Sequence, residues 1–152
     1  MSLKFFFSWE NSTDFFAVIN ANAALIVRGI CQANAVGGVF FGGWVNLGLT
    51  ANLKVHLGGT VLQGPYASIT TLTADTWGSA FFGDGDLKTA NIYTTPLMSR
   101  KNILVQDHQL VIFEVSLDAT YWIDSGSVTI EFSSQDRNVT CPALEIELLT
   151  AP

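Results

Sequence analysis

Residues 110–117 have the sequence LVIFEVSL, in which apolar side chains recur at every second position. Val111, Phe113, Val115 and Leu117 fall on one face of an extended strand, because successive side chains on a strand point to opposite faces. A helix would instead repeat its apolar residues every three or four positions. The stretch therefore predicts a half-buried antiparallel strand with one face in the core.

The same period of two continues towards the C-terminus, in residues 128–132 (VTIEF) and 144–148 (LEIEL). In the last of these strands, leucine and isoleucine alternate with glutamate. We expect one face to lie in the core and the other in water; the two sets are Leu144, Ile146 and Leu148, and Glu145 and Glu147.

Apolar runs separated by turn residues indicate further strands, and no stretch of ten residues has helical periodicity. The expected strands lie at 3–9, 14–20, 23–32, 36–49, 51–57, 60–63, 67–73, 77–83 and 88–94. Many short strands with frequent turns favour an all-β fold. We predict a single antiparallel β-sandwich, jelly-roll-like, that spans residues 1–152 as one domain.

Phenylalanines stand side by side in four places, which hold nine of the eleven in the chain: Phe5, Phe6 and Phe7; Phe15 and Phe16; Phe40 and Phe41; Phe81 and Phe82. On a strand, one Phe of each pair can enter the core while its neighbour points to the other side and needs a second cover. Glycines flank the third group in the sequence GGVFFGGW (37–44), where they would let another backbone approach closely.

These phenylalanines, with Trp44, are the candidate subunit interface. Burying one Phe contributes roughly 1.5–3 kcal/mol, so several together can offset the cost of association. Loops of the same chain, or a bulge that turns both members of a pair to one side, would be the alternative cover. We expect a homo-oligomer, with a trimer as its stoichiometry.

Charged residues make up only 13% of the chain, against about 25% in an ordinary soluble domain. Residues 1–76 carry three acidic and three basic residues, and residues 77–152 carry ten acidic and four basic ones. Nucleic-acid binding needs clustered Lys and Arg, so this balance argues against it. The uncharged stretch 29–53 is long enough to span a membrane, but its glycines oppose a membrane helix.

No signal-peptide core forms near the N-terminus, because Glu10 interrupts the apolar run that follows Lys4. We therefore expect synthesis in the cytoplasm, where Cys31 and Cys141 would be reduced and buried. A disulfide between these two cysteines is the alternative.

Few residues suggest chemistry. Asp84-Gly85-Asp86 resembles part of a calcium loop, but the remaining ligands of an EF-hand do not follow, so a turn is favoured. His56 and His108 have unrelated surroundings, and the chain has no GxSxG nucleophile motif. Trp122, beside an aromatic residue and near acidic ones, could stack on a sugar, although core packing is the commoner role of Trp. We expect no catalytic site, no metal and no cofactor.

The short, weakly charged chain with Gly- and Phe-rich strands resembles the small all-β shell proteins of viruses, and in particular the head decoration, or cement, proteins of tailed bacteriophages. The resemblance covers the whole chain and rests on its composition and its strand pattern, with no shared motif. It implies a jelly-roll-like sandwich that oligomerises and clamps neighbouring capsid subunits. The basic capsid-facing patch of some such proteins is missing here, which puts electrostatic docking in doubt.

We therefore expect a non-enzymatic structural protein of a viral or phage particle, made in the host cytoplasm and located in the virion. Its expected partners are copies of itself and other capsid or particle proteins, with no nucleic acid and no membrane. The alternative is a carbohydrate-binding or adhesion module on the same sandwich, with its ligand near Trp122, Asp84 and Asp86.

Overall fold

The computed structural model of the protein describes residues 1–38, 41–76 and 85–149. Every regular element in these ranges is a β-strand, as the all-β prediction requires. In chain order the strands are β1 (Ser2–Glu10), β2 (Ala17–Ala24), β3 (Ile26–Val36), β4 (Trp44–Leu57), β5 (Thr60–Leu62), β6 (Tyr66–Asp75), β7 (Gly85–Thr94), β8 (Leu97–Val105), β9 (Leu110–Ile123), β10 (Gly126–Glu131), β11 (Val139–Thr140) and β12 (Leu144–Leu149).

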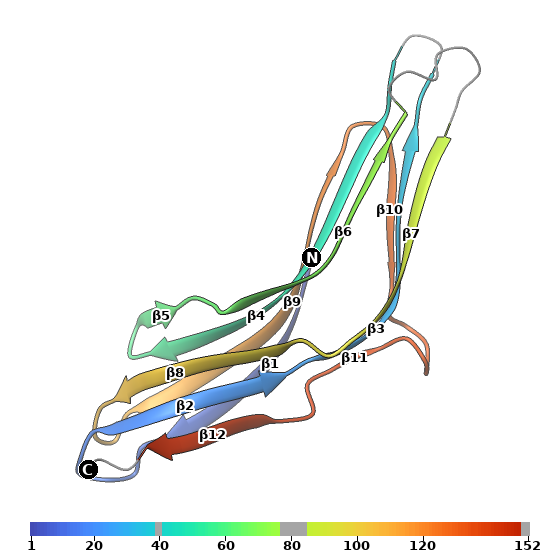
Figure 1. The fold of residues 1–152 in the computed structure, drawn as a ribbon. Coiled ribbons are helices and arrows are strands. Elements are labelled where there is room, and N and C mark those ends of the chain that lie inside the picture. The colour runs from blue at the N-terminus through green and yellow to red at the C-terminus, as the bar shows by residue number, and fades with distance from the viewer. Residues whose placement is uncertain (39–40, 77–84, 150–152) are drawn as a thin grey trace.

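The strands form two layers. The first, called the β9 sheet below, has the order β1-β9-β4, and β5 and β6 both pair with β4. The second contains β12-β2-β8 and, beyond a bend, β3 with β7, β10 and β11. Only Leu25 separates β2 from β3, and its amide donates to the carbonyl of Pro96 between β7 and β8, N···O 3.2 Å. Figure 1 shows both layers turning together at this bend.

The strand pairs are nested along the chain. β1 pairs with β9, β2 with β8, β3 with β7 and β4 with β6, and every pair is antiparallel. The chain therefore forms one long hairpin, with β1 to β4 in one arm and β6 to β9 in the other. The hairpin is rolled up, because β9 pairs with β4 as well as with β1. Rolling a hairpin into two packed sheets is the wrapping of a jelly roll. The predicted antiparallel, jelly-roll-like sandwich is therefore confirmed.

The core lies between the layers and depends on the alternation in β9. Val111, Phe113, Val115 and Leu117 are all buried in it, as LVIFEVSL predicts. Alternate residues of β4 pack beside them because β4 and β9 pair along almost their whole length. Cys31 is buried in the same core, as expected, whereas Cys141 is only partly buried, so its expected burial is wrong. Both cysteines have free thiols.

β12 follows its predicted pattern except at one residue. Leu144 and Ile146 pack against the core, and Glu145 and Glu147 are exposed. Leu148 was expected in the core but is 58% exposed. β12 is an edge strand, and at its end Leu148 borders a hollow instead of packed side chains. The prediction for Leu148 is therefore wrong.

Several predicted boundaries also need correction. The strand expected at 14–20 begins only at Ala17, and the two expected at 36–49 and 51–57 are the single strand β4, which begins at Trp44. The strand expected at 77–83 lies outside the described residues. β8 and β11 were not predicted.

β8 escaped prediction because its apolar period is broken. The pairing of β2 with β8 shifts register between Ile19 and Ala21, and Asn102 adopts a positive φ of 56°. As a result the buried residues Met98 and Ile103 are separated by an odd number of positions. A bulge of this kind lets a strand keep its inner face while its sequence loses the period of two.

Gly43 in GGVFFGGW meets a neighbouring backbone, but that backbone belongs to the same chain. A Cβ atom at Gly43 would overlap the carbonyl oxygens of Val36 and Ser125. The amide of Gly43 donates to Oγ1 of Thr76 at 2.6 Å, which holds the end of β6 beside the start of β4. Gly43 therefore serves the fold of its own subunit.

We predict that Gly43→Ala lowers the free energy of unfolding by about 1–3 kcal/mol, because the added methyl group must displace two backbone carbonyls. Gly85→Ala is the matched control, since among the described residues the nearest atom to a Cβ there lies at an ordinary contact distance of 3.7 Å. Urea unfolding of both variants measures the effect. Equal stability of Gly43→Ala and the wild type would contradict the close approach.

Candidate interaction surfaces

β1 distributes its phenylalanines over both faces of the β9 sheet. Phe5 and Phe7 pack against the core, whereas Phe6 points outwards and is 60% exposed. Across the sheet, Phe6 is the register partner of Glu114 on β9, and Glu114 is in turn the partner of Lys54 on β4. An apolar side chain therefore stands beside a charged row on the outer face.

Glu114 is only 4% exposed, although it lies on the outer face. Three cationic or titratable groups surround its carboxylate: Lys4 Nζ at 2.8 Å, Lys54 Nζ at 3.2 Å and His56 Nε2 at 3.2 Å. Burial raises the pKa of Glu114, but the hydrogen bonds from Lys4 and Lys54 outweigh it, so the pKa lies below its ordinary value. These interactions of Glu114 on β9 with Lys4 on β1 and Lys54 on β4 link the three strands on the outer face.

No sequence signal pointed to this cluster. In LVIFEVSL, Glu114 occupies a position that alternation assigns to water, and the cations come from strands far away in the chain. Only the register of β1 and β4 against β9 brings Lys4 and Lys54 to it.

One end of the sandwich carries a group of exposed apolar side chains, which we call the apolar tip. The connection after β1 and the turn between β8 and β9 meet there: Asn11 Nδ2 donates to the carbonyls of Phe15 and Gln106, at 2.7 and 2.9 Å. His108 Nε2 also lies 3.0 Å from Asp14 Oδ1. The exposed members of the tip are Phe15 and Phe16, with Leu104 on the outer face of β8 and Leu110 on the outer face of β9, which belong to opposite layers.

The prediction that one Phe of each pair enters the core is wrong for Phe15 and Phe16. Phe15 is 77% exposed and Phe16 is 63% exposed, so neither enters the core. Both precede β2, which begins at Ala17, and a loop does not impose the two-faced alternation of a strand. The structure therefore provides two outward phenylalanines here instead of one.

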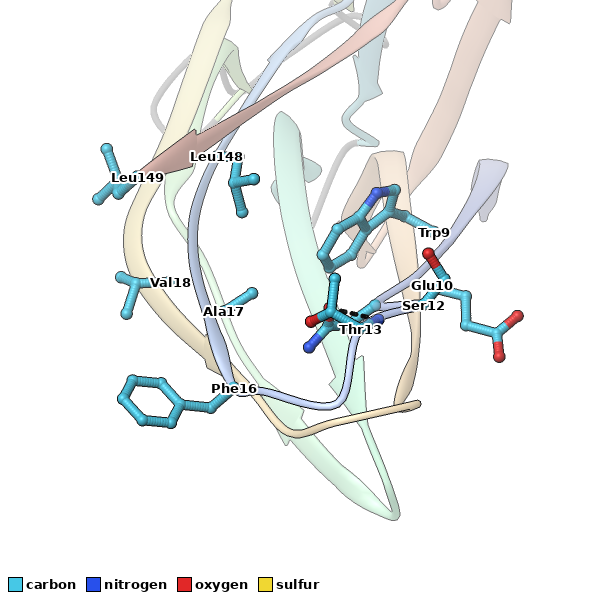
Figure 2. A pocket seen from close by; sticks show the side chains of 10 residues that line it. Trp9, Glu10, Ser12, Thr13, Phe16, Ala17, Val18, Leu148 and Leu149 are labelled. Carbon is cyan, nitrogen blue, oxygen red and sulfur yellow. Dashed lines mark hydrogen bonds between the residues drawn. The ribbon is translucent and has the colours of Figure 1, made fainter. Parts of the chain in front are cut away.

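A hollow of about 330 Å³ lies next to the tip, between the connection after β1 and the end of β12. Figure 2 shows Trp9, Ala17 and Leu148 on its inner side, whereas Phe16 points away from them on the other side of β2. Thr13 Oγ1 donates to Asn11 Oδ1 at 2.9 Å and fixes the loop at the rim. The hollow is largely apolar; Glu10 borders it, with its carboxylate pointing away from Trp9 and Ala17 (Figure 2).

Two further candidate interface residues lie at the far end of the molecule. Phe41 and Trp44 are exposed at the start of β4. Phe40, Phe81 and Phe82 lie outside the described residues.

Of the three residues considered for ligand binding, the structure describes Trp122 and Asp86. Trp122 is 66% exposed on β9, with Asn46 of β4 as its register partner. Asp86 accepts a hydrogen bond from the amide of Asp75 at 3.0 Å and pairs with Lys88 at 2.9 Å, so its carboxylate is occupied. Lys88 and the Asp75 amide lower the pKa of Asp86. Asp84 lies outside the described residues.

Within residues 1–38, 41–76 and 85–149, no group of three or more His, Cys, Asp or Glu side chains is placed to hold a metal ion. The same part of the chain contains no helix with the length and apolarity of a membrane span. Comparisons with protein-family models, with curated proteins and with solved structures gave no match.

We predict that Glu114→Gln lowers the free energy of unfolding by about 3 kcal/mol at pH 7, because it leaves Lys54 poorly exposed and without its anionic partner. Glu131→Gln is the control, since its pair with Arg137 is half exposed and should contribute less than about 1 kcal/mol.

The effect should depend on pH in one direction. Because the folded-state pKa of Glu114 is lowered, its stabilisation is complete above the unfolded-state value of about 4.3 and is lost as pH falls through the folded-state pKa. Chemical unfolding of wild type and Glu114→Gln between pH 3 and 7 should therefore give curves that converge in acid. A difference that stays constant over this range would rule out the carboxylate charge as its cause.

Proposed function

We propose that the protein is a non-enzymatic structural subunit of a viral or phage particle, which assembles with copies of itself and with neighbouring capsid proteins. The apolar tip carries this proposal. It presents two adjacent phenylalanines and two leucines to solvent at one end of a rigid sandwich. Two adjacent exposed phenylalanines favour a contact site, because covering them removes apolar surface from water.

Covering the apolar tip supplies part of the free energy that association requires. Covering Phe15 and Phe16 alone contributes roughly 3–6 kcal/mol, and Leu104 and Leu110 add to it. Loss of translational and rotational freedom costs about 4–15 kcal/mol, so the tip together with a second contact such as Phe6 can sustain a stable assembly.

The charges support apolar docking over electrostatic docking. Of the basic pair Arg100 and Lys101, Arg100 is engaged within the chain, where its guanidinium donates to the carbonyls of Gln63 and Gly64 at 2.6 and 3.0 Å. Lys4 and Lys54 are committed to Glu114. A capsid partner would therefore meet this protein mainly through aromatic and aliphatic groups.

The proposal places the protein in the virion after synthesis in the host cytoplasm. The neutral N-terminal half supplies most of the assembly surface, since it contains Phe6, Phe15, Phe16, Phe41 and Trp44. The acidic half would keep the assembled particle surface soluble.

Carbohydrate binding is the second candidate, and the exposure of Trp122 favours it. An exposed indole beside Asn46 offers a stacking face with an adjacent amide that could bond a sugar hydroxyl. Titration with neutral oligosaccharides, followed by Trp fluorescence in wild type and Trp122→Ala, tests this candidate.

We predict that the double variant Phe15→Ser/Phe16→Ser stays folded but assembles at least about 30-fold more weakly, since interface anchors contribute roughly 2 kcal/mol or more. Leu87→Ser, an exposed leucine on β7, is the control and should assemble normally. Sedimentation and native mass spectrometry at micromolar concentration give the readout, and thermal unfolding checks the fold.

A wild-type protein that stays monomeric at these concentrations would contradict the proposal. Antibodies against the protein should also label particles recovered from lysed source cells in a density gradient. Labelling confined to the soluble fraction would speak against a particle component.

A further inference from the structure

β1 is an edge strand with little protection against pairing. Its only strand partner in the described residues is β9, and that ladder runs from Ser2 to Glu10 without a bulge or a proline. Proteins usually protect edge strands with prolines, bulges, inward charges or a covering segment. β1 has charged residues, Lys4 and Glu10, but they are of opposite sign and so do not repel a second copy of the strand; its regular nine-residue edge is a template for another strand.

The other edges are treated differently. β12 follows Pro142 and carries Glu145 and Glu147 on its outer face, so two copies of β12 would bring like charges together. β6 lies against β7 of the second layer, and Asp75 at its end is bonded to Asp86. β1 has neither the like charges of β12 nor the neighbouring strand of β6.

The hydrogen bonds at both ends of β1 show which backbone groups face its free edge. Met1 and Ala119 exchange two backbone hydrogen bonds: the amide of Ala119 donates to the Met1 carbonyl at 2.8 Å, and the Met1 nitrogen donates to the Ala119 carbonyl at 3.1 Å. The amide of Asn11 donates to the carbonyl of Gln109. In an antiparallel ladder such pairs recur at every second residue, so the odd-numbered residues of β1 bond to β9. The even-numbered residues direct their N–H and C=O groups towards the free edge: Ser2, Lys4, Phe6, Ser8 and Glu10.

The inner side of this edge is apolar and incompletely covered. Phe5, Phe7 and Trp9 pack against the core but are only partly buried. A hollow of about 270 Å³ beside Leu3 lies near one end of β1, and the hollow of about 330 Å³ beside Trp9 lies at the other. An added strand would cover these aromatic side chains along the full edge.

We propose that β1 pairs antiparallel with β1 of a second copy, so that two β9 sheets become one continuous sheet. The inference rests on the proposed assembly of the protein with itself and names the contact. Even-numbered residues of one copy must lie opposite even-numbered residues of the other, because these residues have the N–H and C=O groups that do not bond to β9. The same pairing puts the core-facing sides of the two sheets on one side of the joined sheet. In the register that sets Phe7 opposite Phe7 of the second copy, Lys4 faces Glu10 on the outer side.

This register is complementary on both faces. Each Lys4–Glu10 pair joins opposite charges. Lys4 already binds Glu114 in its own chain, but its side chain is 42% exposed, so its ammonium would be shared with Glu10 of the second copy. Glu10 forms no ion pair with the described residues of its own chain. On the inner side, Phe5 faces Trp9 of the second copy, and such aromatic cross-strand pairs stabilise a sheet. Shifting the register by two residues either way leaves Lys4 opposite serine or beyond the partner strand, so the charges select this alignment.

The first test removes a hydrogen-bond donor from the free edge alone. Ser8→Pro deletes an N–H that makes no bond to β9, and edge strands accept proline at such positions. We expect Ser8→Pro to remain folded, as judged by circular dichroism, and to lose at least tenfold in self-association measured by sedimentation. Ser8→Ala keeps the backbone donor and should assemble like the wild type.

The second test measures the register directly by cross-linking under mild oxidation, in a Cys141→Ser background. Phe7→Cys places two thiols opposite each other in a non-hydrogen-bonded pair, about 4.5 Å apart between Cα atoms, which a disulfide can bridge. Phe5→Cys is the control, because its two copies would lie roughly 13 Å apart along the strands. We expect a cross-linked dimer from Phe7→Cys and little from Phe5→Cys on a non-reducing gel.

The outcomes separate the pairing from the proposed function. A wild-type oligomer that Ser8→Pro leaves intact, equal cross-linking of the two cysteine variants, or a trimeric mass would overturn the pairing while self-assembly stands. The twofold contact requires an even number of copies, in contrast to the trimer expected from the sequence. A wild-type protein that is monomeric at every concentration would overturn both. If Ser8→Pro does not fold, cross-linking of Phe7→Cys by itself tests the pairing of the two β1 strands.

Discussion

The antiparallel ladder between β4 and β9 is the interaction on which the rest of the structure depends. It joins residues 45–57 to residues 111–123 without a break, although the two segments are far apart in the chain. Both strands bury alternate apolar residues on the same face, which forms one wall of the core. β1 then pairs with the free side of β9 and β6 with the free side of β4, so the whole β9 sheet is assembled around this ladder.

The same alternation that fills the core also sets the character of the outer surface. With few charged residues available, the outer face of the β9 sheet combines an exposed phenylalanine, Phe6, with a carboxylate enclosed by lysines, Glu114. The charges there are largely consumed by internal pairing. What remains for a partner on this face is the exposed Phe6 among uncharged polar side chains such as Ser8 and Thr120, so a contact there would involve few free charges.

The apolar tip and the free edge of β1 would contribute different things to an assembly. The tip offers non-directional apolar area, which supplies affinity but little geometric definition. The edge of β1 offers backbone hydrogen bonds at fixed spacing, which impose an orientation on whatever pairs with it. Because β1 leads into the tip through residues 11–16, the two surfaces are held by one continuous segment of chain and by Asn11.

Alternating sequences such as LVIFEVSL and LEIEL determined the strand character, the buried face of β9 and the exposed glutamates of β12, because a period of two is a local property of the backbone. The split of Phe5 and Phe7 from Phe6 follows from the same rule. Three features required the tertiary structure: the exposure of both Phe15 and Phe16, the bulged strand β8, and the enclosure of Glu114 by Lys4 and Lys54. Each of these features depends on where a strand begins, or on which strands pair and in which register. Register is fixed by packing between segments that are distant in the chain, and a local sequence pattern contains no information about that packing.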